Sequence, residues 1–287
     1  MLTQEGCFKR RARLWASLPD FVEWVLITNP RHVKYLSNIW VNPVSFSAGQ
    51  PIWLYLERNG KTVALADNFT LKSLSGEAFV DETASETWYD GKHSVENRDY
   101  KHLAALKGKF GSLDLTSGMV ETESFPVAGL EILKGEQTLN LRLGDVIKKL
   151  RRQKEADEIA HLKTCMRACE AGHDAALEFI RPGVTDMEVY RAVHAAVLEQ
   201  AGRPCVVYGD FRTTNAKIPK AGGLPIGETL QEGDLFILDY SVVLDGYRSD
   251  FTNTIAVGEP SPEQQSLMQA CMGGLEAAEA ALKAGAP

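Results

Sequence analysis

The spacing of hydrophobic and polar positions changes near residue 150 of this 287-residue chain. Before that point, short apolar runs between polar turns predict strands, and apolar residues three or four apart predict helices. The expected strands are residues 22–27, 52–57, 62–66 and 109–115, and the expected helices are residues 8–18 and 98–107. Asn59-Gly60, between the middle two strands, is typical of a type I′ hairpin turn. The pattern predicts an α/β domain, and this part of the sequence has no glycine-rich phosphate loop.

Longer helical patterns follow, over residues 154–180 and 185–202. Thr185 and Glu188 have the spacing of a capping box, and Gly202 suits the position just after a helix end. Strands are expected at residues 206–208, 235–243 and 247–257. The change of pattern predicts two domains, residues 1–148 and 149–287, which is also what the chain length favours.

Asp239 and Asp250 flank the strongest hairpin signal in the sequence, Asp245-Gly246. A two-residue turn there places Asp239 opposite Thr252 in an antiparallel pair. Because paired residues share a face, and so do residues two apart on one strand, Asp239, Asp250 and Thr252 should point the same way.

Two carboxylates that lie close together repel each other unless one is protonated or a cation lies between them. Hard oxygen ligands of this kind suit a divalent metal ion. The apolar residues 235–238 predict a buried strand that leads into Asp239, which favours a metal site. The alternative is an exposed hairpin with ordinary surface acids.

Several segments of the sequence, in the same order, resemble the creatinase/prolidase/aminopeptidase P group, the pita-bread metallopeptidases. Residues 233–254, which contain the two aspartates, resemble the first metal-ligand segment of that group. Residues 28–36 resemble the opening of its amino-terminal domain, residues 152–159 the first helix of its catalytic domain, and residues 180–188 the turn into the next helix.

The resemblance implies a creatinase-like α/β domain followed by the first half of a pita-bread catalytic domain, which is a duplicated α+β fold. It implies a metallopeptidase that hydrolyses amino-terminal Xaa-Pro bonds in peptides with two divalent ions. The expected metal is manganese, with cobalt or zinc as alternatives, and the expected assembly is a homodimer. Asp239 and Asp250 correspond to metal ligands, and Thr252 to a residue that orients a ligand carboxylate.

Three further ligands of the family, one histidine and two glutamates, would come from a second repeat of the catalytic domain. Residues 168–172 and 180–183 recur near the end of the chain as residues 270–274 and 282–285, which suggests that this second repeat only begins here. We therefore expect the metal site, and the activity, of residues 1–287 to be incomplete.

Two positions depart from the family pattern. Residues 218–224, Ile-Pro-Lys-Ala-Gly-Gly-Leu, lack the histidine that the family has there, with Lys220 as the only cation, and Asn253 stands in place of an arginine. These departures keep two alternatives open, a catalytically silent binding or chaperone-like protein on the same fold and a metal-free creatinase-like hydrolase.

The composition is compatible with the family that the sequence resembles. A net charge of −7 and a pI near 5.5 argue against nucleic acid as the main partner. No signal peptide and no membrane-spanning stretch is recognisable, so no membrane partner is expected. Five cysteines without regular spacing fit a reducing compartment, and we expect a cytoplasmic protein.

Overall fold

The computed structural model describes residues 1–74, 76–93, 95, 97–136, 141–215, 217 and 222–286. It forms two compact units, residues 1–164 with 244–247, and residues 165–243 with 248–287. The long helix α7 (Ala156–Phe179) contributes to both units, and the boundary at residue 148 stays a prediction.

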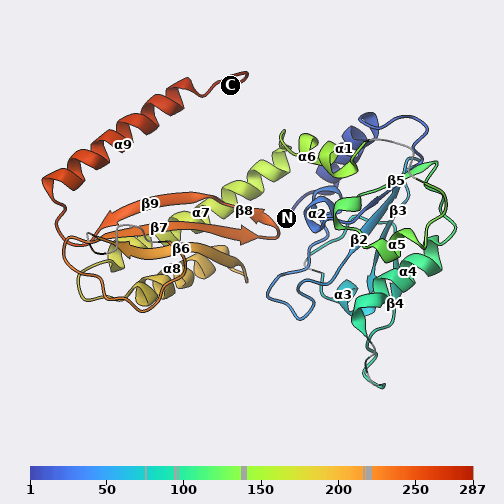
Figure 1. Ribbon diagram of the computed structural model, residues 1–287, viewed down its shortest axis with the longest axis horizontal. Helices are drawn as coiled ribbons and strands as arrows, with labels where there is room; N and C mark the ends of the chain where they lie inside the picture. Colours follow the sequence, from blue (N-terminus) through green and yellow to red (C-terminus); the bar gives the residue numbers. More distant parts are fainter. Residues whose placement is uncertain are drawn as a thin grey trace. The chain divides into compact units, whose positions relative to one another are not determined.

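The first unit is built on a five-stranded mixed sheet with the strand order β4-β3-β2-β1-β5 (Figure 1). Strand β1 runs parallel to β5 and β3 runs parallel to β4, whereas the pairs β1–β2 and β2–β3 are antiparallel. The strands are β1 (Trp24–Ile27), β2 (Trp53–Glu57), β3 (Thr62–Asp67), β4 (Glu82–Glu86) and β5 (Gly118–Val120).

Helices pack on both faces of this sheet and bury two apolar cores. One core joins the sheet to α1, α2 and α6, through residues such as Leu14, Leu36 and Ile147. The other core includes Leu106 and Phe110 of α4 and Phe125 near α5. The helices are α1 (Gln4–Ala16), α2 (Pro30–Ser37), α3 (Asn68–Lys72), α4 (Lys101–Phe110), α5 (Val127–Leu130) and α6 (Leu143–Leu150), with 3-10 turns at η1 (Arg98–Tyr100) and η2 (Thr122–Ser124).

The strand predicted at residues 109–115 is wrong. Its first residues end α4, where the ring of Phe110 lies 4.1 Å from that of Tyr55, and the real strand β5 follows at Gly118–Val120. Three residues are too few to show a period in the sequence. Strand β4 is absent from the prediction because it is a largely exposed edge strand made mostly of polar residues.

The type I′ turn predicted at Asn59-Gly60 is also wrong. Of the two residues only Gly60 has a positive φ, 108°, whereas a type I′ turn needs two. The backbone N–H of Glu57 donates to the carbonyl of Lys61 at 2.8 Å, and the N–H of Gly60 donates to the carbonyl of Glu57 at 3.0 Å. The connection is therefore a three-residue loop that ends in a left-handed glycine.

The second unit pairs a four-stranded antiparallel sheet with α7 and α8 (Figure 1). The capping box of Thr185 with Glu188 and the left-handed Gly202 bound α8, as predicted. A second capping box, of Ser261 with Gln264, begins the last helix. The elements are α8 (Asp186–Ala201), β6 (Val206–Thr214), β7 (Leu235–Leu244), β8 (Tyr247–Arg248), β9 (Phe251–Ala256) and α9 (Pro262–Ala281).

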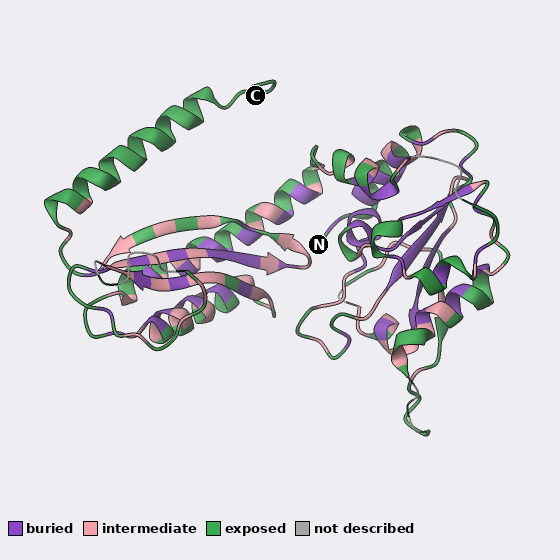
Figure 2. Cartoon of the chain, viewed as in Figure 1, coloured by how far each residue is buried: buried purple, intermediate pink, exposed green. Residues whose placement is uncertain are grey.

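Alternate residues of β7 face the helices, and the remaining ones face the opposite side of the sheet. The buried Tyr240 hydroxyl donates to the backbone carbonyl of Cys169 in α7. A Cβ on Gly172 would lie 2.6 Å from that hydroxyl, so the absence of a side chain allows α7 and β7 to approach closely. By contrast, α9 has no buried residue and is exposed along nearly its whole length (Figure 2). Among the described residues no helix is both long and apolar enough to cross a membrane.

Candidate functional site

The turn between β7 and β8 is the predicted two-residue turn. Asp245 and Gly246 both have positive φ, 46° and 84°, as a type I′ turn requires. A Cβ on Gly246 would also lie 2.8 Å from the indole ring of Trp40. Glycine at 246 is therefore favoured both by backbone conformation and by space.

The register that follows from this turn is also the predicted one. Asp239 lies directly opposite Thr252 in the pair of β7 with β9. Nearer the turn, the backbone N–H of Ser249 donates to the carbonyl of Val242 at 3.0 Å, and the Ser249 hydroxyl accepts from the N–H of Val242 at 2.8 Å. Regular strand pairing resumes at Phe251, one residue after Asp250.

Asp250 and Thr252 are exposed, whereas Phe251 between them is half-buried, with its ring 5.0 Å from that of His173 in α7. Phe251 therefore faces the helix, and its two neighbours face the opposite side of the sheet. Since Asp239 shares a face with its partner Thr252, all three predicted site residues belong to this outer face.

Arg248 interacts electrostatically with both aspartates, and no local pattern in the sequence singles it out. Its guanidinium donates to the hydroxyl of Tyr208 at 2.8 Å and lies 3.8 Å from Oδ2 of Asp250. The pKa of Arg248 is raised, first by the hydrogen bond with Tyr208 and then by the charges of Asp250 and Asp239. The outer face thus carries an exposed cation beside its carboxylates.

A third carboxylate, Asp210 of β6, lies directly opposite Asp239 on its other side. Its Oδ1 accepts the backbone N–H of Gly223 at 2.6 Å. The sequence-based strand ended at residue 208 because Gly209-Asp210 interrupts the apolar pattern. Gly209 has a φ of 152°, and a Cβ there would lie 2.1 Å from the carbonyl oxygen of Asp239, so this glycine lets β6 continue alongside β7.

The donor atoms on this face suit a hard divalent ion, but they are few. No group of three or more histidine, cysteine, aspartate or glutamate side chains within the described residues is arranged to hold a metal. A hard divalent ion takes roughly six ligands, so Asp239 and Asp250 supply only part of a coordination shell. Residues 218–221 lie outside the described part of the chain, and Lys220 therefore cannot be placed.

Each of the three histidines in the helical region contacts other residues of the fold. His161 is buried, and its Nε2 lies 3.0 Å from the carbonyl oxygen of Leu244. Nε2 of His173 lies 2.9 Å from Nδ2 of Asn253, the residue found where the family has arginine. His194 packs against Tyr190, with ring centroids 4.0 Å apart. Cys165 and Cys169 are fully buried in α7.

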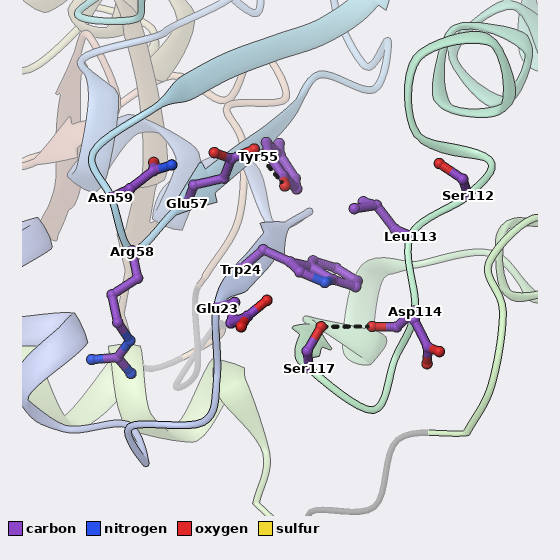
Figure 3. A pocket seen from close by; sticks show the side chains of 10 residues that line it. All are labelled: Glu23, Trp24, Tyr55, Glu57, Arg58, Asn59, Ser112, Leu113, Asp114 and Ser117. Carbon is purple, nitrogen blue, oxygen red and sulfur yellow. Dashed lines mark hydrogen bonds between the residues drawn. The ribbon is translucent and has the colours of Figure 1, made fainter.

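A separate acidic cavity of about 640 Å³ lies in the first unit (Figure 3). Glu57 there accepts the Tyr55 hydroxyl at 2.9 Å, and Asp114 accepts the backbone N–H of Thr116 at 2.9 Å. The guanidinium of Arg58 points away from the cavity and donates to the carbonyl of Pro19 at 2.7 Å. These groups have partners within the fold, and neither predicted metal ligand lines the cavity.

Comparison with known proteins finds a family model that matches the second part of the chain. The model of metallopeptidase family M24 matches residues 160–287. The Bacillus subtilis protein YkvY is 28% identical over 159 residues, which cover 55% of this chain and 40% of that protein. A Xaa-Pro dipeptidase of Lactobacillus helveticus is 27% identical over 217 residues, which cover 72% of this chain and 57% of the dipeptidase. The chain thus spans about half the length of these two relatives.

Solved structures share the fold over nearly the whole chain. The X-Pro aminopeptidase of Thermotoga maritima matches with a TM-score of 0.62 at 17% identity, covering 92% of this chain and 71% of the aminopeptidase. The prolidase of Pyrococcus horikoshii matches with a TM-score of 0.61 at 18% identity, covering 92% of this chain and 68% of the prolidase. These likenesses confirm the expected creatinase-like and pita-bread architecture. Over residues 160–287 the chain matches the model of metallopeptidase family M24.

Proposed function

We propose that the chain is part of a cytoplasmic, homodimeric metallopeptidase that hydrolyses amino-terminal Xaa-Pro bonds. The observation that carries this proposal is the hairpin of β7 and β9, which brings Asp239, Asp250 and Thr252 to one face. The match of residues 160–287 to the model of metallopeptidase family M24 supports a metal-dependent peptidase, and the Xaa-Pro specificity rests on the named relatives.

The chain's own residues have distinct parts in this proposal. Asp239 and Asp250 would bind divalent ions, manganese in the first instance, through their carboxylate oxygens. Thr252, directly opposite Asp239, would donate its hydroxyl hydrogen to a ligand carboxylate and so fix its orientation. When bound, two such ions supply an activated water and polarise the scissile carbonyl of the peptide.

Calorimetric titration of residues 1–287 with Mn²⁺ tests the metal site without requiring turnover. Because only two carboxylates bind the ion, its affinity should be weak, with a dissociation constant on the order of 10⁻⁴ to 10⁻³ M. Asp239→Asn and Asp250→Asn should each weaken binding by at least about tenfold, because each removes a charged ligand. Asp174→Asn, at a side chain that is 68% exposed in α7, is the matched control and should bind as the parent does. Equal binding by all four proteins would overturn the proposed site.

One observation favours a binding protein as the second candidate. The histidine that the family carries before the first aspartate strand is absent from residues 218–224 of this sequence. A protein of that kind would bind a Xaa-Pro peptide without cleaving it. Peptide binding that is unchanged in Asp239→Asn and requires no metal would favour this second function over the peptidase.

A further inference from the structure

A cavity of about 400 Å³ lies in the first unit, where the carboxyl ends of two neighbouring parallel strands meet. Thr28 follows the last residue of β1 directly, and Ser124 lies four residues after the end of β5, and both line the cavity. In open α/β sheets this edge is where ligands bind, when the chain leaves the two strands toward opposite faces.

The chain does leave β1 and β5 toward opposite faces. From β1 it enters α2, whose Val33 and Leu36 belong to the core shared with α1 and α6. From β5 it continues to Phe125 and Leu133, which belong to the core shared with α4. The carboxyl ends of β1 and β5 therefore form a topological switch point of the sheet, and residues at that point line the cavity.

The walls of the cavity are mainly apolar and aromatic. Trp40 and Trp53 line it, together with Ile39 and Ile52. Its volume is within the roughly 300–1,000 Å³ of small-molecule sites, which combine apolar walls with a few polar groups. The polar groups here are the side chains of Thr28, Arg31, Gln50 and Ser124.

Among the residues that the structure describes, Arg31 is the only charged one that lines the cavity. Its side chain forms no hydrogen bond or ion pair with any other described residue. The backbone N–H groups at the start of α2 are already satisfied, since Asn29 accepts from Arg31 through its side chain and from His32 and Val33 through its carbonyl. The nearby Glu121 carboxylate is buried and accepts the N–H groups of Thr28 and Asn29. A ligand charge would therefore be recognised by the Arg31 guanidinium.

We propose that this cavity binds a small carboxylate with a flat, apolar body. The body would pack against Trp40 and Trp53, and the carboxylate would pair with Arg31. The site is independent of Asp239 and Asp250 and goes beyond the proposed peptidase function.

The test uses the full 287-residue chain labelled with ¹⁵N, and follows its five tryptophan indole resonances. The probe is phenylacetate, and phenylacetamide is its neutral counterpart. We expect phenylacetate to shift the Trp40 and Trp53 resonances and to leave those of Trp15 and Trp88 unchanged. Phenylacetamide should bind about tenfold more weakly, which is the loss expected for one charge-assisted interaction. Trp40→Phe assigns the Trp40 resonance.

Two arginine variants test whether the charge of Arg31 contributes to the binding of phenylacetate. Arg31→Gln should weaken phenylacetate binding about tenfold, whereas Arg142→Gln, at another exposed arginine of the first unit, should leave it unchanged. Unshifted Trp15 and Trp88 resonances in each variant show that the fold is retained. The proposal is overturned if phenylacetate moves no indole resonance, if the acid and the amide bind equally, or if Arg31→Gln binds as the parent does.

Discussion

Asp239 of β7 lies directly opposite Thr252 of β9, and the two side chains share the outer face of the sheet. Side chains alternate along a strand, so a register shift of one residue would turn Asp239 toward the helices. The turn at residues 245–246 sets this register, and the candidate site therefore depends on a turn at the far end of β7.

Gly246→Ala should destabilise the protein more than Gly60→Ala. Both substitutions put a side chain on a residue with positive φ, which costs about 1–2 kcal/mol. At 246 the new Cβ would also meet the Trp40 ring, which adds about 1–3 kcal/mol, whereas no atom lies within 4 Å of a Cβ at 60. Free energies of unfolding in urea, followed by tryptophan fluorescence, measure the difference. Equal losses would show that the Trp40 ring moves aside at no cost.

Asp157→Asn should cost on the order of 3 kcal/mol at pH 7, because it removes the carboxylate bonded to both ends of the buried Arg10 guanidinium and leaves only Glu158, 3.7 Å away, as its counter-charge. Arg10 bonds to the two carboxylate oxygens of Asp157 at 2.8 and 3.0 Å, and their side chains are 0% and 6% exposed. Asp174→Asn, at an exposed side chain, should cost little.

The stability that Asp157→Asn loses should become smaller as the pH falls. Burial raises the pKa of Asp157, but the hydrogen bonds from Arg10 and Thr3 outweigh burial and hold it below its ordinary value. The stabilisation is therefore present above about pH 4, the ordinary pKa, and is lost as the pH falls through the lower folded value. The difference between parent and Asp157→Asn should shrink below about pH 4, and a constant difference down to pH 2 would contradict this account.

His161 should make the protein less stable as the pH falls from 6.5 to 4. Burial, and then the charge of the amino terminus, lower the pKa of His161 to about 4. Between these two pH values the unfolded chain binds a proton that the folded chain does not, so on the order of 3 kcal/mol is lost. His161→Gln keeps a donor for the Leu244 carbonyl and should reduce this slope, while His102 and His194, whose pKa values burial also lowers, keep a smaller part of it.

His93→Gln is the control for His161, because the side chain of His93 is 81% exposed. Its unfolding free energy should follow the pH in the same way as that of the parent. A parent protein whose stability changes with pH between 6.5 and 4 as that of His161→Gln does would show that His161 is protonated in the folded state.

Helix α9 should cause residues 1–287 to associate. Leu267 and Leu275 are 61% and 55% exposed, and exposed apolar surface of this kind favours contacts between molecules. The double substitution of both leucines by glutamate should lower the mean mass measured by light scattering after gel filtration. Glutamate at Gln265 and Gln269 adds the same charge to α9 without removing apolar surface and should leave the mass unchanged. If both variants lower the mean mass equally, the added charge alone reduces association, and the exposed leucines are not its cause.

The sequence predicted best what local chemistry determines. The Asp245-Gly246 turn implied the register of the Asp239 hairpin, and the capping box and Gly202 gave the bounds of α8, because each depends on residues a few positions apart. The positions of Asp210, Tyr208 and Arg248 depend on pairing between strands distant in sequence, which no local pattern encodes. Strand β5 was missed because it is three residues long and takes its place from β1 beside it.

The capping box that begins α9 bears on the order of folding during synthesis. Ser261 and Gln264 satisfy each other's backbone N–H groups, so this helix end forms from residues three positions apart. It can form as soon as its first turns leave the ribosome. The strands are made before this helix, but β7 can pair with β9 only once residue 256 has been made, twelve residues after β7 ends. A newly made chain would therefore present β7 with one free edge for as long as it takes to synthesise the following dozen residues, and that interval is when pairing with another chain competes with the native hairpin.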